Sequence, residues 1–327
     1  MNREKSLITA CTLTLLSALS VCGPAALAQQ AYPSKTIRLI VPFSAGGGGD
    51  VIARKIAIRL AERTGVPVVV ENRVGASGNI GAELVVKSPP DGYTLLSTSS
   101  TYGVQAALAK LSYDPITDVT PIVGVARSHT LFVVRPGSPI RTLRDLIEAA
   151  KRQPGKLTYG TAGVGAIAHM QSEEMASVAG IKMTHVPYKG TSQALIDLLG
   201  GTIDVIPSNP ASATAQIRSG QVRALAVGGE SRLPALPDVP TFAEAGLPGF
   251  DPSDWKALLG PKGMPAEIVA KVNSEVNAIL KEKDFAAVLE ADGSMAFGGS
   301  PEQLLKVIKA DVERWRNLVR DRQIKME

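Results

Sequence analysis

A run of glycines near the N-terminus is the clearest candidate for ligand chemistry in this sequence. The stretch from Val41 to Asp50 reads VPFSAGGGGD, and it joins a predicted strand to a predicted helix. Glycines let the backbone adopt positive φ and approach a ligand closely. The helix start would add unpaired N–H groups and the positive end of a dipole, so backbone alone could bind an anion. A tight turn with no ligand fits the same residues.

The glycine run does not fit the common nucleotide loops. A P-loop would end in Gly-Lys-Ser/Thr, and Gly49-Asp50-Val51 stands there instead. Glu71 lies about twenty residues further on, which leaves a dinucleotide site open, although an exported protein rarely has that cofactor available. We therefore expect no cofactor. Asp50 would repel an anion, so we expect it to bond with N–H groups of its own loop, with direct ligand contact as the alternative.

Further polar or glycine-rich clusters follow other predicted strands. They occupy residues 75–79, 97–100, 160–165 and 208–209. Open α/β sheets bind ligands beyond the carboxyl ends of their strands, so these loops could converge on one polar cleft. Each cluster taken alone is equally consistent with a simple turn.

Catalytic and metal-binding patterns are poor. The three histidines, His129, His169 and His185, lack metal-ligand spacing, and we interpret them as structural. No G-x-S-x-G nucleophile elbow occurs, and Glu173-Glu174 is interpreted as a solvated helix face. We predict a protein that is not an enzyme and holds no metal, while an exported α/β enzyme stays an alternative because catalytic groups converge only in space.

Strands and helices are expected to alternate along the chain. Helix starts are indicated by an apolar face beginning near Asp50, with Gly65 as its stop, and by capping boxes at Thr142, Thr241 and Ser300. Short apolar runs suit strands covered on both faces, as in parallel, doubly wound α/β sheets. The predicted strands cover residues 37–41, 66–70, 93–97, 131–134, 157–160, 184–186, 203–206 and 223–227.

The N-terminus has the pattern of a secretory signal. Arg3 and Lys5 precede an apolar run from Leu7 to Val21, and cleavage is predicted after Ala28. Both cysteines, at positions 11 and 22, fall within this segment, so the mature chain would hold no thiol. The net charge of +5 mildly favours anionic partners. Nucleic acid is not expected, because basic residues are scattered and aromatic residues are few.

The chain resembles the substrate-binding receptors of tripartite tricarboxylate transporters, the Bug family of periplasmic solute-binding proteins. The resemblance covers essentially the whole mature chain. It rests on these stretches: Tyr32-Pro33-Ser34-Lys35, Val41-Pro42-Phe43, Val70-Glu71-Asn72-Arg73, Gly78-Asn79-Ile80-Gly81, Pro90-Asp91-Gly92-Tyr93-Thr94-Leu95, Tyr113-Asp114-Pro115, Pro154-Gly155-Lys156-Leu157, His185-Val186-Pro187-Tyr188-Lys189-Gly190, Asp197-Leu198-Leu199-Gly200-Gly201 and Leu236-Pro237-Asp238-Val239-Pro240-Thr241.

This resemblance implies a type II Venus-flytrap fold whose two α/β lobes close on a small carboxylate. We place lobe 1 at residues 29–124 and 251–327 and lobe 2 at 125–250, with crossovers near 124–128 and 250–255. The implied partner is a membrane permease, with a sensor protein as the alternative, and the protein is expected to be a periplasmic monomer. The ligand-binding residues implied are Phe43, Ser44, Ala45, Gly46, Gly47, Asp50, Ser97, Ser99, Thr161, Gly163, Val164, Ala166, Asn209 and Trp255.

Several positions depart from what is usual in the family and bear on the ligand. Ser44-Ala45 replace two prolines, alanine stands at 166 and 168 instead of hydroxyl residues, and Ser208 stands where an aspartate is frequent. We therefore expect a ligand without an amine, such as a dicarboxylate with an apolar body. Trp255 could line the cleft or pack within a lobe. Lys256 is expected to be solvated, with assistance to an anion as the alternative.

Overall fold

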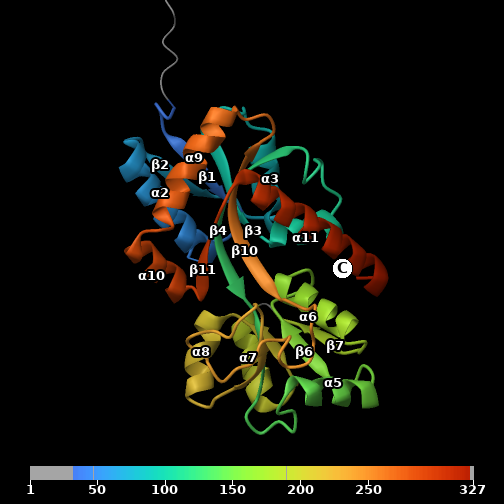
Figure 1. Cartoon of the computed structure of the whole chain (residues 1–327). Coiled ribbons are helices and arrows are strands. Elements are labelled where there is room, and N and C mark those ends of the chain that lie inside the picture. The colour runs from blue at the N-terminus through green and yellow to red at the C-terminus, as the bar shows by residue number, and fades with distance from the viewer. Residues whose placement is uncertain (1–31, 47, 189, 325–327) are drawn as a thin grey trace, which may run out of the picture. The chain divides into compact units, whose positions relative to one another are not determined.

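The computed structural model describes residues 32–46, 48–188 and 190–324. The predicted secretory signal and its cleavage site after Ala28 lie outside the described residues. From Lys35 onward the chain forms one compact unit (Figure 1). No helix in the described part of the chain is long and apolar enough to cross a membrane.

The larger sheet has six strands and is mixed. Strands β1, β2 and β3 are parallel, whereas β10 pairs antiparallel with both β3 and β4, and β11 pairs antiparallel with β4. The apolar run of β1 is almost completely buried, as expected for a strand covered on both faces. In spatial order the strands are β11 (Ser294–Gly298), β4 (Val119–His129), β10 (Ser253–Pro261), β3 (Thr94–Ser99), β1 (Ile37–Val41) and β2 (Val68–Asn72).

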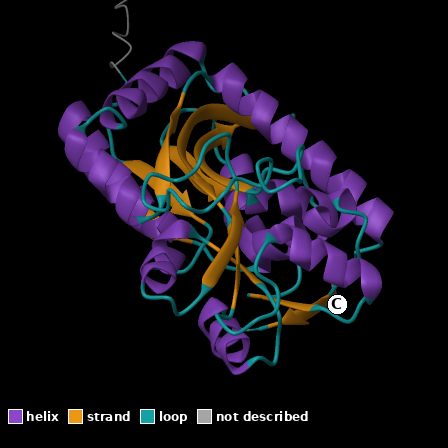
Figure 2. Ribbon diagram, turned by 60° about the horizontal axis from the view of Figure 1, so that its bottom comes forward, coloured by secondary structure: helices purple, strands orange, loops and turns teal. Residues whose placement is uncertain are grey.

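Helices lie on both sides of the strands in this unit (Figure 2). Around the six-stranded sheet, Ile40 and Leu96 meet Ile308 of the last helix in one buried apolar cluster. A short 3-10 turn, η1 (Ala76–Gly78), precedes one of these helices. The helices of this part are α2 (Gly48–Thr64), α3 (Asn79–Val86), α4 (Thr101–Leu108), α9 (Ala266–Ile279), α10 (Lys283–Ala291) and α11 (Pro301–Arg322).

The central part of the chain builds two smaller sheets. One is three-stranded and antiparallel, in the order β8 (Ile206–Ser208), β5 (Leu131–Val134) and β9 (Arg223–Val227). The other pairs β6 (Thr158–Thr161) with β7 (Thr184–Pro187) in parallel. Phe132 packs edge-on against Phe242 in the core beneath them. The helices here are α5 (Leu143–Arg152), α6 (Ile167–Val178), α7 (Thr191–Gly200) and α8 (Pro210–Arg218).

Strands β4 and β10 connect the two parts. They run side by side, with Ser253 opposite His129, at the point where the chain leaves the large sheet and later returns to it (Figure 1). Paired strands of this kind can act as a hinge, because a small change at their ends moves one part against the other. The lobe boundaries at 124/125 and 250/251 stay a prediction.

Most of the helices and strands predicted from the sequence are confirmed; the informative exceptions are three strands that were not predicted and one predicted helix that does not form. The strands β4, β10 and β11 were not predicted, and their pairing makes the large sheet mixed and not purely parallel. Pro121 and Gly124 interrupt the apolar pattern of β4; Gly124 is required because a Cβ there would meet the ring of Phe297 at 2.3 Å. The Thr142 and Ser300 capping boxes open helices as predicted.

The other exception is the predicted helix at Thr241. Its reciprocal bonds with Glu244 do form, at 2.8 and 3.1 Å, but the segment continues as turns. Gly246 with φ +95° and Pro248 follow within one turn, so the backbone cannot extend the helix. The prediction of a helix there is wrong.

Candidate functional site

The glycine-rich loop after β1 is closed by its own hydrogen bonds. The amide of Gly46 donates to Asp50 Oδ2 at 2.8 Å. Asn72 Nδ2 donates to Asp50 Oδ1 at 2.8 Å and to the carbonyl of Phe43 at 2.9 Å. Arg54 Nε completes the set, 2.9 Å from Asp50 Oδ2. The expectation that Asp50 bonds within its own loop is therefore confirmed.

The charge state of Asp50 follows from these contacts. Burial by itself raises the pKa of this carboxyl, but the hydrogen bonds from Arg54, Gly46 and Asn72 together lower it to about 2. Asp50 is thus an anion at neutral pH, and its side chain is 1% exposed. A buried, satisfied carboxylate holds the loop in shape but offers no donor to a ligand.

A first cavity lies beside this loop, with a volume of about 410 Å³. It brings together residues from both predicted lobes, and none of its lining residues is charged. The beginnings of three helices reach it, at Gly78 for α3, Thr101 for α4, and Ala166 and Ile167 for α6. The lining residues are Pro42, Phe43, Ser44, Val74, Gly75, Ser77, Gly78, Thr101, Ala162, Val164, Gly165, Ala166 and Ile167.

None of the three N-cap residues makes a side-chain capping bond, but only α6 starts without another partner among the described residues. The amide of Thr101 in α4 donates to Ser99 Oγ at 3.4 Å, and the amide of Asn79 in α3 donates to the carbonyl of Ala76. Gly78 and Ala166, the N-cap residues of α3 and α6, have no side-chain donor or acceptor, and Ser100 of α4 makes no capping bond. The first N–H groups of a helix have no partner within it, and the dipole places partial positive charge there. An uncharged cavity that receives three such ends favours an anion.

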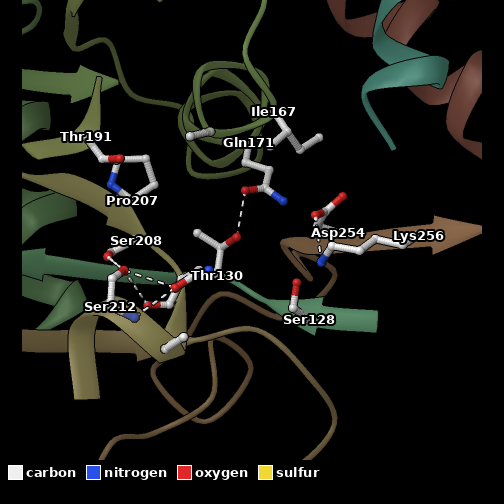
Figure 3. Close-up of a pocket in the computed structure, with 13 residues that line it drawn as sticks. Ser128, Thr130, Ile167, Gln171, Thr191, Pro207, Ser208, Ser212, Asp254 and Lys256 are labelled. Atoms are coloured by element: carbon white, nitrogen blue, oxygen red, sulfur yellow. Dashed lines mark hydrogen bonds and ion pairs between the residues drawn. The ribbon is translucent and has the colours of Figure 1, made fainter. Parts of the chain in front are cut away.

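A second cavity, of about 630 Å³, adjoins the first at Ile167, which lines both (Figure 3). Asp254 and Lys256 of β10 lie on one side of it. Lys256 Nζ is 3.0 Å from Asp292 and 4.0 Å from Asp254, and its side chain is only 12% exposed. The expectation that Lys256 is solvated is wrong, because the two carboxylates hold its ammonium group at the cavity wall.

The rest of the second cavity is lined mainly by hydroxyl and amide groups. Thr130 Oγ1 donates to Gln171 Oε1 at 2.8 Å, and Asn209 Oδ1 accepts from the amide of Ser212 at 2.9 Å to cap α8 (Figure 3). The full lining comprises Ser128, Thr130, Ile167, Ala168, Gln171, Thr191, Pro207, Ser208, Asn209, Ala211, Ser212, Asp254 and Lys256.

The predicted ligand-binding residues fall into distinct places. Phe43, Ser44, Val164 and Ala166 line the first cavity, and Asn209 lines the second. Gly47 lies outside the described residues. The part these residues play in binding stays a prediction. Those that line neither cavity are Ala45, Gly46, Asp50, Ser97, Ser99, Thr161, Gly163 and Trp255.

Trp255 and Thr161 show why some predicted residues line neither cavity. Trp255 is 3% exposed in the core around the large sheet, and its indole Nε1 donates to Asp311 Oδ2 at 2.5 Å. The structure places it as a packing residue, the second of the two roles considered for it. Thr161 is also buried, and its hydroxyl lies 2.7 Å from His185 Nε2.

His169 and His185 stack behind the loop that joins β6 to α6, with ring centroids 4.1 Å apart. Burial lowers the pKa of His169, and burial together with the neighbouring His169 lowers the pKa of His185 to about 4. The amide of Gly165 donates to His169 Nδ1 at 3.1 Å, which shapes the turn before α6. Their structural interpretation agrees with these contacts, and the described residues contain no cluster of ligands for a metal.

Glu173 and Glu174 are also structural, and the expectation of a solvated face is wrong. Glu173 accepts from Tyr159 Oη at 2.5 Å and from Arg322 Nε at 2.9 Å. Glu174 pairs with Arg314. Both arginines belong to α11, so ion pairs fasten α6 to the C-terminal helix. Their sequence separation of 140 and 149 residues explains why the pattern alone could not reveal them.

Sequence reasoning missed important lining residues. Gly78 was recognised only as part of a turn-forming stretch, and neither Thr101 nor Ile167 was singled out. Ser128 lies on a strand that was not predicted, Gln171 lies inside a helix, and Asp254 lies at the edge of a predicted crossover. A polar residue at the end of a strand could have pointed to Ser128, had β4 been recognised.

Comparison with known proteins gives a consistent result. Residues 52–324 match the model of the tripartite tricarboxylate transporter family receptor. Protein BugT of Bordetella pertussis is 35% identical over 299 residues, covering 90% of this chain and 92% of BugT. Two solved structures from Rhodopseudomonas palustris are also similar.

The first of these, Rpa4515 with adipate, is 35% identical with a TM-score of 0.76, covering 90% of this chain and 99% of that one. The second, MatC with bound malate, is 32% identical with a TM-score of 0.74, covering 88% and 100%. These likenesses confirm the two-lobed α/β fold of a periplasmic solute-binding receptor, a class of proteins that are not enzymes. The chain belongs to the tripartite tricarboxylate transporter receptor family.

Proposed function

We propose that this chain captures a small mono- or dicarboxylate and delivers it to the membrane permease of a tripartite transporter. One observation carries the proposal: an uncharged cavity receives the starts of α3, α4 and α6, and none of their three N-cap residues makes a side-chain capping bond. The relatives solved with adipate and malate support a carboxylate as the ligand.

In this proposal the ligand carboxylate lies at the beginning of α6. Ala166 has extended backbone and a methyl side chain, so the first N–H groups of the helix face the cavity without competition. Phe43 and Ser44 approach from the opposite part of the molecule and line the same cavity. Closure around β4 and β10 would bring the two walls together and exclude water, which strengthens a charge–dipole interaction.

A thermal-shift screen of organic acids on the signal-free protein tests the proposal. Ligand at a hundred times its Kd should add about 2.7 kcal/mol to the free energy of unfolding. The amides that correspond to the stabilising acids serve as controls, because they keep the size but lose the charge. Equal stabilisation by acid and amide, or none by any acid, would reject anion capture.

The partner and the exported state need separate measurements. Mass spectrometry of exported protein should give an N-terminus at Gln29 if cleavage follows Ala28, and light scattering should give a monomer. Deletion of the gene should abolish uptake of the bound acid while leaving other acids unaffected. Normal uptake together with tight binding would reject delivery to a permease and favour a sensor as the partner.

A further inference from the structure

We infer that the second cavity selects a ligand whose body carries hydroxyl groups, so that the preferred solute is a hydroxylated monocarboxylate. This inference rests on the proposed function, because it takes the carboxylate to be held at the start of α6. The two cavities adjoin at Ile167, the first residue of that helix. A ligand anchored there can therefore extend its body along the wall formed by Ala168 and Gln171.

The charges at the far wall disfavour a second carboxylate. Lys256 is the cation that faces this cavity, and it is shared between Asp292 at 3.0 Å and Asp254 at 4.0 Å. One ammonium between two carboxylates leaves a net negative group. A second ligand carboxylate would meet this negative charge, and like charges brought together in a partly buried site repel.

The same group offers both donors and acceptors to a hydroxyl. Asp254 accepts a hydrogen bond from Ser100 through Oδ1, and its other oxygen lies beyond the usual hydrogen-bond distance from Lys256. A ligand hydroxyl can donate to that oxygen and accept from the ammonium group of Lys256. An ammonium group on the ligand could donate to Asp254 but could not accept from Lys256, and the two positive charges would lie close together.

The hydroxyl of Ser128 provides an independent sign of a ligand. Ser128 lines the cavity and the residue is only 6% exposed, yet its Oγ makes no hydrogen bond to any described residue. Its side chain points towards Lys256 (Figure 3). A hydroxyl of a largely buried residue that opens into a cavity without a protein partner can bond a polar group of a bound molecule. Thr130, Ser208 and Asn209 continue this polar lining.

This assignment differs from the apolar-bodied dicarboxylate that the sequence suggested. Neither Ser128 nor Asp254 could be placed in the cleft from its sequence position, because the strands that carry them were not predicted. With both in place, the cavity presents the Ser128 hydroxyl and the second oxygen of Asp254 with hydrogen-bonding capacity to spare, and an apolar chain would leave these groups without water or partner.

Four acids with six carbons test the inference by calorimetry on the full mature chain. They are hexanoate, gluconate, adipate and 6-aminohexanoate. Each carries a carboxylate at one end, and they differ in the groups on the rest of the carbon chain. Gluconate should bind at least tenfold more tightly than the other three. Tighter binding of adipate, hexanoate or 6-aminohexanoate would overturn the hydroxyl assignment while leaving anion capture standing. Binding of none of the four would count against the proposed function itself.

Two variants locate the selectivity. Asp254→Asn and Ser128→Ala should each lower the gluconate-to-hexanoate preference, Asp254→Asn by about tenfold and Ser128→Ala by about threefold, because each removes one hydrogen bond to the body. Asp91→Asn, on an exposed carboxylate that pairs with Lys35 away from both cavities, is the matched control. An unchanged preference in Asp254→Asn, with an unfolding transition like that of the wild type, would overturn the inference.

Discussion

Two glycine-containing loops approach the same cavity, and they differ in what satisfies their amides. The first, after β1, is closed internally by Asp50, whose carboxylate accepts from Gly46 and from Asn72. The second, after β6, ends at Ala166, where α6 begins without a side-chain cap. In the loop with more consecutive glycines the Gly46 amide is therefore occupied by a side chain, whereas the loop with fewer glycines leads to a helix start without a side-chain cap.

The difference teaches that glycine content alone does not identify an anion site. Glycine permits the sharp turns, such as Gly163 with φ +112° and Gly165 with φ +74°. Whether the helix that follows can bind an anion depends on the residue at its N-cap. An acidic side chain close to the start of α2 stabilises the loop and consumes a donor, whereas an alanine at the N-cap of α6 leaves the donors free.

The largest effect should come from placing an acid at the second loop. Ala166→Asp puts a preferred N-cap residue at the start of α6, where its carboxylate would occupy the site of the ligand. We expect affinity for a bound carboxylate to fall about a hundredfold, which corresponds to about 2.7 kcal/mol. The free energy of unfolding without ligand should rise by about 1 kcal/mol, as measured by urea titration.

Ala45→Asp is the matched control for this prediction. Ala45 is exposed in the first loop and lines neither cavity, so the same added charge should weaken binding by less than about threefold. Ala166→Asn caps the helix without a charge and should lie between the two. A larger loss of affinity from Ala45→Asp than from Ala166→Asp would reverse the comparison.

The next effect concerns stability at the first loop. Asp50→Ala removes the acceptor of Gly46, Arg54 and Asn72 and should lower the free energy of unfolding by about 2 kcal/mol. Asp50→Asn keeps part of this network and should cost less. Because the pKa of Asp50 is lowered to about 2, its contribution is present at neutral pH and is lost as the pH falls from about 4 towards 2. Loss of binding at unchanged stability would instead indicate direct ligand contact.

Much of the fold could be predicted from the sequence, and the limits have physical causes. Strands such as β1 and β5 are short apolar runs, and the capping boxes at Thr142 and Ser300 are local, so pattern reasoning finds them. Strand β4 contains a proline and a glycine that only its partners explain. The pattern at Thr241 is locally correct but is stopped by Gly246 and Pro248.

The candidate site likewise contains residues that could be predicted from the sequence and residues that could not. Phe43, Ser44, Val164, Ala166 and Asn209 were expected from the family resemblance, and the structure places them along the two cavities. Ion pairs between residues that are far apart in the sequence could not be recognised from local patterns. Lys256 with Asp292, and Glu174 with Arg314, looked solvated because their partners are remote in sequence.

A smaller effect is the pH dependence of the free energy of unfolding that comes from His185, next to the second loop. The pKa of His185, behind the second loop, is lowered from 6.5 to about 4, so the folded state favours its neutral form. Stability from this group is complete above about pH 6.5 and is lost as the pH falls towards 4, by about 2 kcal/mol once solvent screening of the partly exposed ring is allowed for. His185→Phe keeps a ring in the stack and should flatten the unfolding free energy between these pH values. An unchanged slope would place the titration elsewhere.

The smallest effect tests how the second loop is held from behind. Arg322→Ala removes the partner of Glu173 on α6 and should lower the free energy of unfolding by about 1 kcal/mol, with less than a twofold change in ligand affinity. Arg320→Ala is a suitable control, since Arg320 is exposed and its one ion pair with a described residue is to its neighbour Asp321. A strong loss of affinity in Arg322→Ala would show that the ion pair sets the position of the α6 start.

A crystal structure of the mature protein with a bound monocarboxylate tests the central claim most directly. We predict that the carboxylate oxygens lie within hydrogen-bond distance of the first N–H groups of α6, at Ile167 and Ala168. The amide of Gly46 should remain bonded to Asp50 in that complex. A carboxylate held instead by the amides of residues 46–49, with the start of α6 left to solvent, would contradict the account.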